Sequence, residues 1–273
     1  MIDAVSTVST VSTSATLLRR RLDGRRDLLA LAAAHPQRYP GLLESAADGA
    51  GARWDILFAF PQTVIESRPN GAGAVDFLST MDEAWSADSV ARLDDDLPFR
   101  GGWLLYLGYE LAAQIERRLD LPEASTALPT AVALRCPAAI LLDRRDHCCW
   151  LVAEAGNESM LEQMADDLAT TAPAKPTMPP LVEVIEDKPE RYLAGVGHIH
   201  QYLRAGDIFQ VNLSRGWRAR YATDVPPTGL FASLRLANPA PFAALFQWQG
   251  AAVLSSSPER LVCVSGESVQ TRP

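Results

Sequence analysis

The sequence predicts an α+β protein whose strands pair mainly in antiparallel fashion. Two apolar segments, 138–143 and 148–154, flank a polar turn and have the pattern of a hairpin. Four more short strand-like segments follow one another after residue 241, with helical patterns beside them rather than between them. No glycine-rich phosphate-binding motif lies between a predicted strand and a predicted helix, which argues against a βαβ nucleotide-binding fold.

Composition narrows the possible functions. The 273 residues are 48% hydrophobic and 21% charged, which is typical of a soluble globular protein of one large or two ordinary domains. The net charge of −8 argues against nucleic-acid binding, and no apolar run approaches the roughly 20 residues that span a bilayer. Four cysteines do not make a disulfide framework in a chain of this length, so we expect a reducing, cytoplasmic setting.

The first 27 residues are rich in serine and threonine and then in arginine. This composition loosely resembles an organelle transit peptide, but it lacks the continuous apolar core of a secretory signal. We interpret the stretch as a frayed tail, and residues 1–40 as a tail and lead-in to the folded chain.

Between residues 41 and 175 the patterns predict short strands and few helices. Each predicted strand is a run of apolar or aromatic residues bounded by turn residues, and each predicted helix has apolar residues three or four apart. The elements are a strand at 54–60, a helix at 75–85, a strand that becomes a helix within 101–116, and the hairpin at 138–154.

A proline-rich stretch marks the predicted internal boundary. Residues 171–180 contain four prolines and little periodicity, which is typical of a linker. We therefore divide the chain into the lead-in, an N-terminal region at 41–175 and a second region at 176–273.

The second region opens with a predicted helix. Asp187 and Glu190 are spaced as in a capping box, and Gly206 is a suitable residue for ending the helix. Residues 207–215 then alternate apolar and polar side chains and predict a strand whose polar face could line a cleft or face solvent. A helix at 229–237 and strands at 242–248, 251–257, 260–264 and 268–272 follow.

Taken residue by residue, the sequence carries few chemical signals. The segment Ser255–Arg260 places three hydroxyls, a proline and a Glu–Arg pair between two predicted strands. A carboxylate held there can act as a general acid or base if burial raises its pKa, although a surface ion pair is the simpler interpretation. Cys148 and Cys149 follow His147 but predict no metal site, because adjacent strand residues point to opposite faces.

Five segments together resemble the chorismate-utilising enzymes, a family that includes anthranilate synthase component I and aminodeoxychorismate synthase component I. The resemblance covers residues 42–273 and implies the fold of that family, mainly antiparallel sheets packed as a sandwich with flanking helices. The segments are LLESA at 42–46, GGWLLYLGYELAAQIE at 101–116, AGDIFQVNLSR at 205–215, ANPAPFAALF at 237–246 and SSSPERLV at 255–262 with QTRP at 270–273.

The resemblance also implies that this chain is the N-terminal part of a longer enzyme. In the family, the QTRP segment leads into Ile-Lys-Gly-Thr or Ile-Ala-Gly-Thr and then a long region with most chorismate contacts and the Mg²⁺-binding glutamates. Position 275 would be lysine in aminodeoxychorismate synthases and alanine in anthranilate synthases. We therefore expect the 273-residue chain to hold no Mg²⁺ ligands of its own and to be inactive alone.

The family resemblance assigns roles to seven residues. Glu259 matches the glutamate that assists as the 4-hydroxyl leaves chorismate. Six other residues match a tryptophan pocket, which gives feedback inhibition in anthranilate synthases and holds a tightly bound L-tryptophan in some aminodeoxychorismate synthases. These are Ser45, Arg53, Trp54, Pro241, Phe242 and Ala243.

The resemblance favours one reaction over another. Anthranilate synthases usually have Asn-Pro-Ser-Pro-Tyr-Met where this chain has Asn-Pro-Ala-Pro-Phe-Ala at 238–243, which favours the synthase component of 4-amino-4-deoxychorismate formation, in para-aminobenzoate and folate biosynthesis. Its expected partner is a glutamine amidotransferase, in a heterodimer, that delivers ammonia. LLES at 42–45 is common in anthranilate synthases, which keeps anthranilate synthase component I as the alternative. A non-catalytic module that binds tryptophan or docks an amidotransferase is the alternative of another class.

Overall fold

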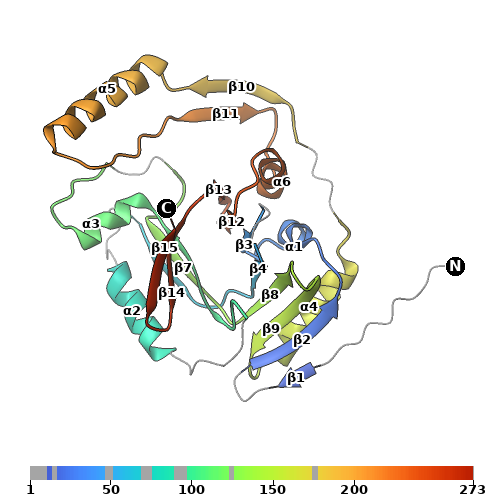
Figure 1. The fold of residues 1–273 in the computed structure, drawn as a ribbon. Coiled ribbons are helices and arrows are strands. Elements are labelled where there is room, and N and C mark those ends of the chain that lie inside the picture. Colours follow the sequence, from blue (N-terminus) through green and yellow to red (C-terminus); the bar gives the residue numbers. More distant parts are fainter. Residues whose placement is uncertain are drawn as a thin grey trace. The chain divides into compact units, whose positions relative to one another are not determined.

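The computed structural model describes residues 11–13, 17–46, 52–68, 76–88, 97–122, 126–173 and 178–272. Figure 1 shows the elements along the chain. The chain divides into two compact units, one formed by residues 1–176 together with 227–273 and the other by residues 177–226.

The first unit contains an eight-stranded sheet in which every neighbouring pair of strands is antiparallel. Its strand order is β1-β2-β9-β8-β4-β3-β12-β13, so strands from the start and the end of the unit share one sheet. The strands are β1 (Val11–Thr13), β2 (Leu17–Asp23), β3 (Gly41–Glu44), β4 (Trp54–Ala59), β8 (Ala138–Asp143), β9 (Cys148–Glu154), β12 (Phe242–Trp248) and β13 (Ala251–Ser257).

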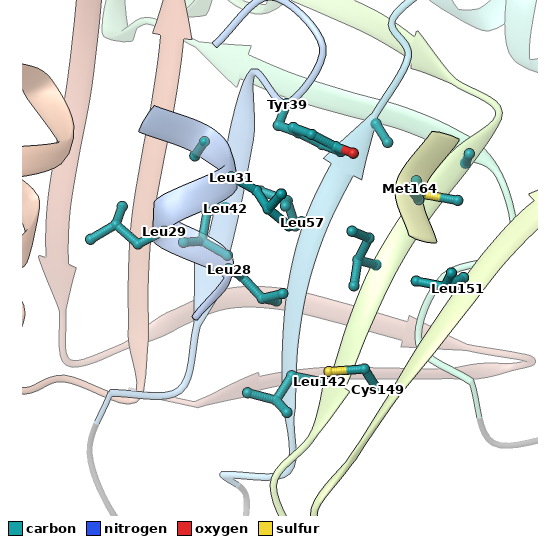
Figure 2. Packing of buried hydrophobic residues seen from close by; sticks show 14 of the residues in the cluster. Leu28, Leu29, Leu31, Tyr39, Leu42, Leu57, Leu142, Cys149, Leu151 and Met164 are labelled. Atoms are coloured by element: carbon teal, nitrogen blue, oxygen red, sulfur yellow. The ribbon is translucent and has the colours of Figure 1, made fainter. Parts of the chain in front are cut away.

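Three helices cover one face of this sheet: α1 (Leu28–Ala34), α4 (Glu158–Thr170) and α6 (Pro227–Ala237). Their apolar side chains pack with those of the strands into the largest buried cluster, part of which is shown in Figure 2. Leu31 of α1, Met164 of α4 and Leu57 of β4 are each at most 1% exposed. Burial of apolar side chains of this size contributes about 1.5–3 kcal/mol each, so this layer fixes the helices on the sheet.

The opposite face of the sheet packs against a second, three-stranded antiparallel sheet of order β5-β7-β6. Phe58 and Phe246 from the large sheet contact Leu104, Val132 and Leu134 from the small one in one buried cluster. The strands are β5 (Val64–Ser67), β6 (Gly102–Leu107) and β7 (Ala131–Cys136). The predicted sandwich of antiparallel sheets with flanking helices is thereby confirmed.

Smaller elements complete the first unit. The helix α2 (Phe77–Ala87) packs on β5 and buries Phe77. A single turn of 3-10 helix, η1 (Tyr109–Leu111), and the short α3 (Ala112–Ile115) follow β6. A separate two-stranded hairpin consists of β14 (Arg260–Ser265) and β15 (Ser268–Arg272).

The second unit pairs β10 (Leu181–Glu186) with β11 (Trp217–Tyr221) and carries the long helix α5 (Pro189–Ala205). Gly206 ends this helix in the left-handed conformation at φ 79°, which a glycine adopts without steric cost.

Most predicted elements are confirmed. The strand at 54–60, the helix at 75–85, the strand and helix within 101–116, the hairpin at 138–154, the helix at 229–237 and the four C-terminal strands all occur, with ends shifted by a few residues. The proline-rich stretch precedes the second compact unit, which begins at Thr177; after Pro226 the chain returns to the first unit. The predicted helix at 75–85 and the acidic and Asn-Gly loops lie partly or wholly outside the described residues.

Three predictions are wrong. The lead-in is not a tail from residue 17 onward, because Leu17 and Leu18 are buried and β2 pairs with β9 along its whole length. The alternating segment 207–215 forms no strand, and the strand that pairs with β10 is β11 instead. The capping box does not form: Lys188 is the N-cap, and the Asp187 carboxylate accepts a 3.0 Å hydrogen bond from the Gly216 amide.

Candidate functional site

One end of the eight-stranded sheet gathers the residues that the sequence singles out. At this end β3 finishes at Glu44, where it pairs with the second residue of β12. Trp54 at the start of β4 pairs with Asp143 at the end of β8, and Phe242 at the start of β12 pairs with Ser257 at the end of β13. Antiparallel pairing therefore brings the ends of five strands, β3, β4, β8, β12 and β13, to the same end of the sheet.

Ser45 lies at this end, directly after β3. Its backbone N–H donates to Asp55 Oδ1 at 2.9 Å, and its hydroxyl donates to the carbonyl of Trp54 at 3.4 Å. These bonds attach the end of β3 to the start of β4, so the predicted pocket positions Ser45 and Trp54 are neighbours in the structure.

Arg53 is held in place by a buried carboxylate. Its Nε and Nη2 donate to Asp143 Oδ2 at 3.0 and 2.8 Å, and its guanidinium carbon lies 4.5 Å from the centre of the Trp54 ring. Burial alone would raise the pKa of Asp143, but the Arg53 hydrogen bonds, with backbone N–H groups of Arg145 and Asp146, hold it below its usual value. Arg53 therefore uses two of its N–H groups on Asp143 and lies against the Trp54 ring.

The other three predicted pocket residues lie at the start of β12. Ala243 is 2% exposed and belongs to the cluster under the helices. Phe242 precedes it and therefore points to the opposite face of the sheet, where the Arg260 guanidinium lies 5.9 Å from its ring. The six predicted positions come together at one sheet end, but from both faces of the sheet.

Glu259 lies in the turn between β13 and β14, two residues beyond this same sheet end, and is exposed. Its backbone carbonyl accepts a 2.9 Å hydrogen bond from the Ser257 hydroxyl, which fixes the turn rather than the carboxylate. The described residues do not supply the burial on which the acid–base interpretation of Glu259 depends.

A buried carboxylate at this end was not among the predicted site residues. Glu44 is 6% exposed, and its Oε1 accepts a 2.8 Å hydrogen bond from Arg235 Nη1 of α6. Its Oε2 is buried and has no hydrogen-bond partner among the described residues. Burial raises the pKa of Glu44, and the raise is only partly offset by Arg235. The sequence signal was a glutamate ending a buried strand in the LLES motif.

A second carboxylate on the same face shapes the field around Glu44. Asp55 is 2% exposed and accepts hydrogen bonds from Arg144 Nε at 2.8 and 3.0 Å. Its charge adds to the raise in the pKa of Glu44. Because Asp55 already has Arg144 and the amide of Ser45 as partners, the unsatisfied acceptor at this end is Glu44 Oε2.

The described residues contain no group of three or more His, Cys, Asp or Glu side chains that could hold a metal ion. Among the same residues, no helix is long and apolar enough to cross a membrane.

Comparison with known proteins identifies similar chains. The family model described as chorismate binding enzyme matches residues 42–273. An anthranilate synthase component I-like protein of Synechocystis is 32% identical over 184 residues, which are 67% of this chain and 38% of that protein. The aminodeoxychorismate synthase component 1 of Escherichia coli K12 is 29% identical over 245 residues, 83% of this chain and 52% of that protein.

A solved structure supports the fold. The crystal structure of anthranilate synthase component I from Streptococcus pneumoniae matches 82% of this chain and 54% of that one, with a TM-score of 0.65 and 22% sequence identity. The chain therefore spans about half or less of the length of the relatives named here.

Proposed function

The chain belongs to the family of chorismate binding enzymes, and we propose that it is part of a synthase component that forms 4-amino-4-deoxychorismate from chorismate and ammonia. The family match over residues 42–273 supports a reaction on chorismate, and the name of the E. coli relative supports this particular product. 4-Amino-4-deoxychorismate is the precursor of para-aminobenzoate, so the proposed reaction belongs to folate biosynthesis.

The residues at the start of β12 support this reaction over the alternative. Phe242 has no hydroxyl, and Ala243 is too small to reach beyond the buried cluster in which it lies. The pattern usual in anthranilate synthases has tyrosine and methionine at these two positions. Anthranilate synthase component I remains the second candidate, because LLES at 42–45 and the name of the Synechocystis relative favour it.

Glu259 is the catalytic residue of the proposal. Its carboxyl group would donate a proton to the 4-hydroxyl of chorismate, which leaves as water while the lysine expected at position 275 bonds to C2; ammonia would then enter at C4 and release that lysine. Because Glu259 is exposed in this chain, the proposal requires a further segment to cover the turn that carries it. On this basis the 273-residue chain alone is inactive.

The proposed reaction also requires a Mg²⁺ ion and a glutamine amidotransferase subunit. We propose that Mg²⁺, held by the glutamates that the family resemblance implies, would bind the substrate carboxylate and position the ring. Ammonia would come from a glutamine amidotransferase subunit paired with this chain in a heterodimer.

The codons after Pro273 provide the first test. A lysine at position 275 within Ile-Lys-Gly-Thr supports aminodeoxychorismate formation, and an alanine there assigns the enzyme to anthranilate formation. A stop codon would leave only a non-catalytic module that binds tryptophan or docks an amidotransferase.

The assay uses the protein encoded by the whole reading frame, with chorismate, Mg²⁺ and ammonium chloride, and separates the products by chromatography. We expect 4-amino-4-deoxychorismate, with a rate lowered roughly 100-fold or more in Glu259→Gln. Release of fluorescent anthranilate and pyruvate would refute the proposed reaction. Turnover by the 273-residue chain itself would refute its inactivity.

We also propose that the sheet end binds L-tryptophan. An ammonium group has three donors and a positive charge, so it would satisfy the free, buried Oε2 of Glu44. Ser45, Arg53, Trp54, Pro241, Phe242 and Ala243 lie at the ends of the same strands, with Ala243 on the face of Glu44 and the Trp54 and Phe242 rings on the opposite face.

Calorimetry with L-tryptophan tests this second proposal. We expect saturable binding to the 273-residue chain, at least roughly tenfold weaker binding to Glu44→Gln, and none of indole-3-propionate, which lacks the ammonium group. Glu183→Gln, a change at an exposed glutamate of β10, is the matched control and should leave binding unchanged. Equal binding of the two ligands would exclude Glu44 as the ammonium partner.

A further inference from the structure

The arginine-rich N-terminal stretch that the family resemblance leaves unexplained lines a cavity. After β2 ends, Gly24 donates its N–H to the carbonyl of His147 at 3.1 Å, and this bond turns the chain toward α1. Arg25 and Arg26 lie in this turn. They open onto a cavity of about 260 Å³ whose lining residues are Arg25, Arg26, Asp27, Ala30, Leu31, Leu168, Thr171 and Pro173.

Both guanidinium groups are without an acidic partner in the described part of the chain. Other arginines of β2 and its surroundings are paired, as in Arg20 with Glu162 and Arg21 with Asp23. The only hydrogen bond from either guanidinium joins Arg26 Nη1 to the carbonyl of Arg25 at 3.1 Å, again among the described residues. Five N–H donors on each group thus leave ample capacity for a ligand.

The third charge at the cavity is already satisfied. Asp27 caps α1 by accepting a 3.2 Å hydrogen bond from the Leu29 N–H, and its Oδ1 lies 3.6 Å from Arg235 Nη2. Two arginines and one aspartate give the lining a charge of +1. A single formal positive charge on the lining suits a monoanion.

The remaining lining is mostly apolar. Ala30 and Leu31 of α1 and Leu168 of α4 form walls, and the Thr171 side chain adds one hydroxyl. The volume lies just below the roughly 300–1,000 Å³ of sites for drug-sized ligands. A ligand that fits is therefore smaller than a drug molecule, with one anionic group and an apolar body.

From this arrangement we propose that Arg25 and Arg26 form a binding site for a small monoanionic organic acid, a carboxylate on an apolar ring or chain. The carboxylate accepts hydrogen bonds from the two guanidinium groups, which match its planar geometry. The apolar body lies against Ala30, Leu31 and Leu168. Nothing in this proposal depends on the reaction proposed above.

The test uses benzoate as the probe and the 273-residue chain, with ligand-observed NMR and calorimetry at low ionic strength. We expect saturable binding of benzoate, weakened roughly tenfold or more in each of Arg25→Gln and Arg26→Gln. Benzamide, the neutral molecule of the same shape, should not bind. Arg145→Gln is the control, because this arginine is 72% exposed in its side chain and does not line the cavity.

Three outcomes would overturn the proposal. Benzamide could bind as well as benzoate, which would remove the role of the charge. Benzoate could bind equally to the double variant R25Q/R26Q, which would place its site elsewhere. Inorganic phosphate could bind where benzoate does not, which would refute the ligand class. Far-UV circular dichroism of each variant separates loss of binding from loss of folding, since cations near the end of α4 also stabilise a helix.

Discussion

Replacing Arg235 by alanine tests whether Glu44 is a buried, charged carboxylate that depends on Arg235 for its stabilisation. Arg235 belongs to α6, and its Nη1 makes the only side-chain hydrogen bond found for Glu44 in the described residues. The variant leaves a carboxylate that is 6% exposed with neither oxygen bonded. We therefore expect Arg235→Ala to destabilise the first unit far more than the loss of a surface arginine would.

The magnitude follows from the exposure of the two partners. Removing one member of a fully buried ion pair costs about 3–5 kcal/mol. The Arg235 side chain is 27% exposed, so water screens this pair in part, and Arg144 also acts on Glu44. We expect a loss of about 2–3 kcal/mol in the free energy of unfolding at pH 7. The loss corresponds to a fall of about 4–12 °C in melting temperature for a chain of this size.

The loss should depend on pH in a defined direction. The pKa of Glu44 is raised above its usual 4.5 by burial, so the folded state favours the protonated form. Its contribution to stability is therefore greatest below pH 4.5 and declines as pH rises through the folded pKa. Arg235 lowers that pKa, so removing it raises the pKa further. The cost of Arg235→Ala should then grow as the pH rises above 4.5.

Urea unfolding followed by far-UV circular dichroism at several pH values measures this cost. Arg145→Ala is the control, because its pair with Asp146 is exposed and should contribute at most about 1 kcal/mol. In the background of Glu44→Gln, the pH dependence of the Arg235→Ala cost should largely disappear. A cost that is constant with pH, or largest at pH 5, would refute the assignment of a raised pKa and a charged partner.

Three further predictions concern a core leucine, the Arg53–Asp143 ion pair and the cysteines. Leu42→Ala, at a fully buried position, should cost about 2–5 kcal/mol in urea unfolding, whereas Leu43→Ala, 38% exposed, should cost under about 1.5. Asp143→Asn should cost about 1–3 kcal/mol in the free energy of unfolding at pH 7, and the cost should fall as the pH is lowered below 3.8. The reason is that the Arg53 hydrogen bonds outweigh burial and lower the pKa of Asp143, so its charge stabilises the fold only above that pKa. A cost that does not change with pH would contradict this. Burial raises the pKa of Cys136 to about 12 and of Cys149 to about 11, so at pH 8 a thiol reagent should modify the partly exposed Cys263 quickly, and Cys136 and Cys149 only after denaturation.

The sequence predicted well wherever a local pattern decides the structure. The hairpin of β8 and β9 and the strands β12 to β15 have apolar runs and turn residues that leave few alternatives. The segment 207–215 shows the limit of such patterns. Its alternation is that of a strand, but a strand also needs a partner strand, and in the structure the partner of β10 is β11 rather than this segment.

The site was less predictable because its contacts cross the whole first unit. Glu44 and Arg235 are 191 residues apart in the sequence, and no local pattern relates them. The tail interpretation of the N-terminus failed for a similar reason, since β2 pairs with β9, more than a hundred residues later, and Leu17 and Leu18 are buried in clusters of residues distant in the sequence. Family resemblance supplied the six pocket positions, but it did not show that Phe242 and Ala243 point to opposite faces.

Stability alone does not explain why charged groups are buried at this end of the sheet. Apolar residues of similar volume often replace a buried ion pair at no cost, and an unsatisfied buried acceptor costs about 1–3 kcal/mol. Both oxygens of Asp55 and both oxygens of Asp143 accept hydrogen bonds. These two carboxylates can therefore stabilise the fold by holding strand ends together. Glu44 Oε2 lacks any such partner in the described chain. A free acceptor beside otherwise satisfied carboxylates is what a site for a cationic ligand group requires, and this asymmetry favours Glu44 as a ligand-binding residue.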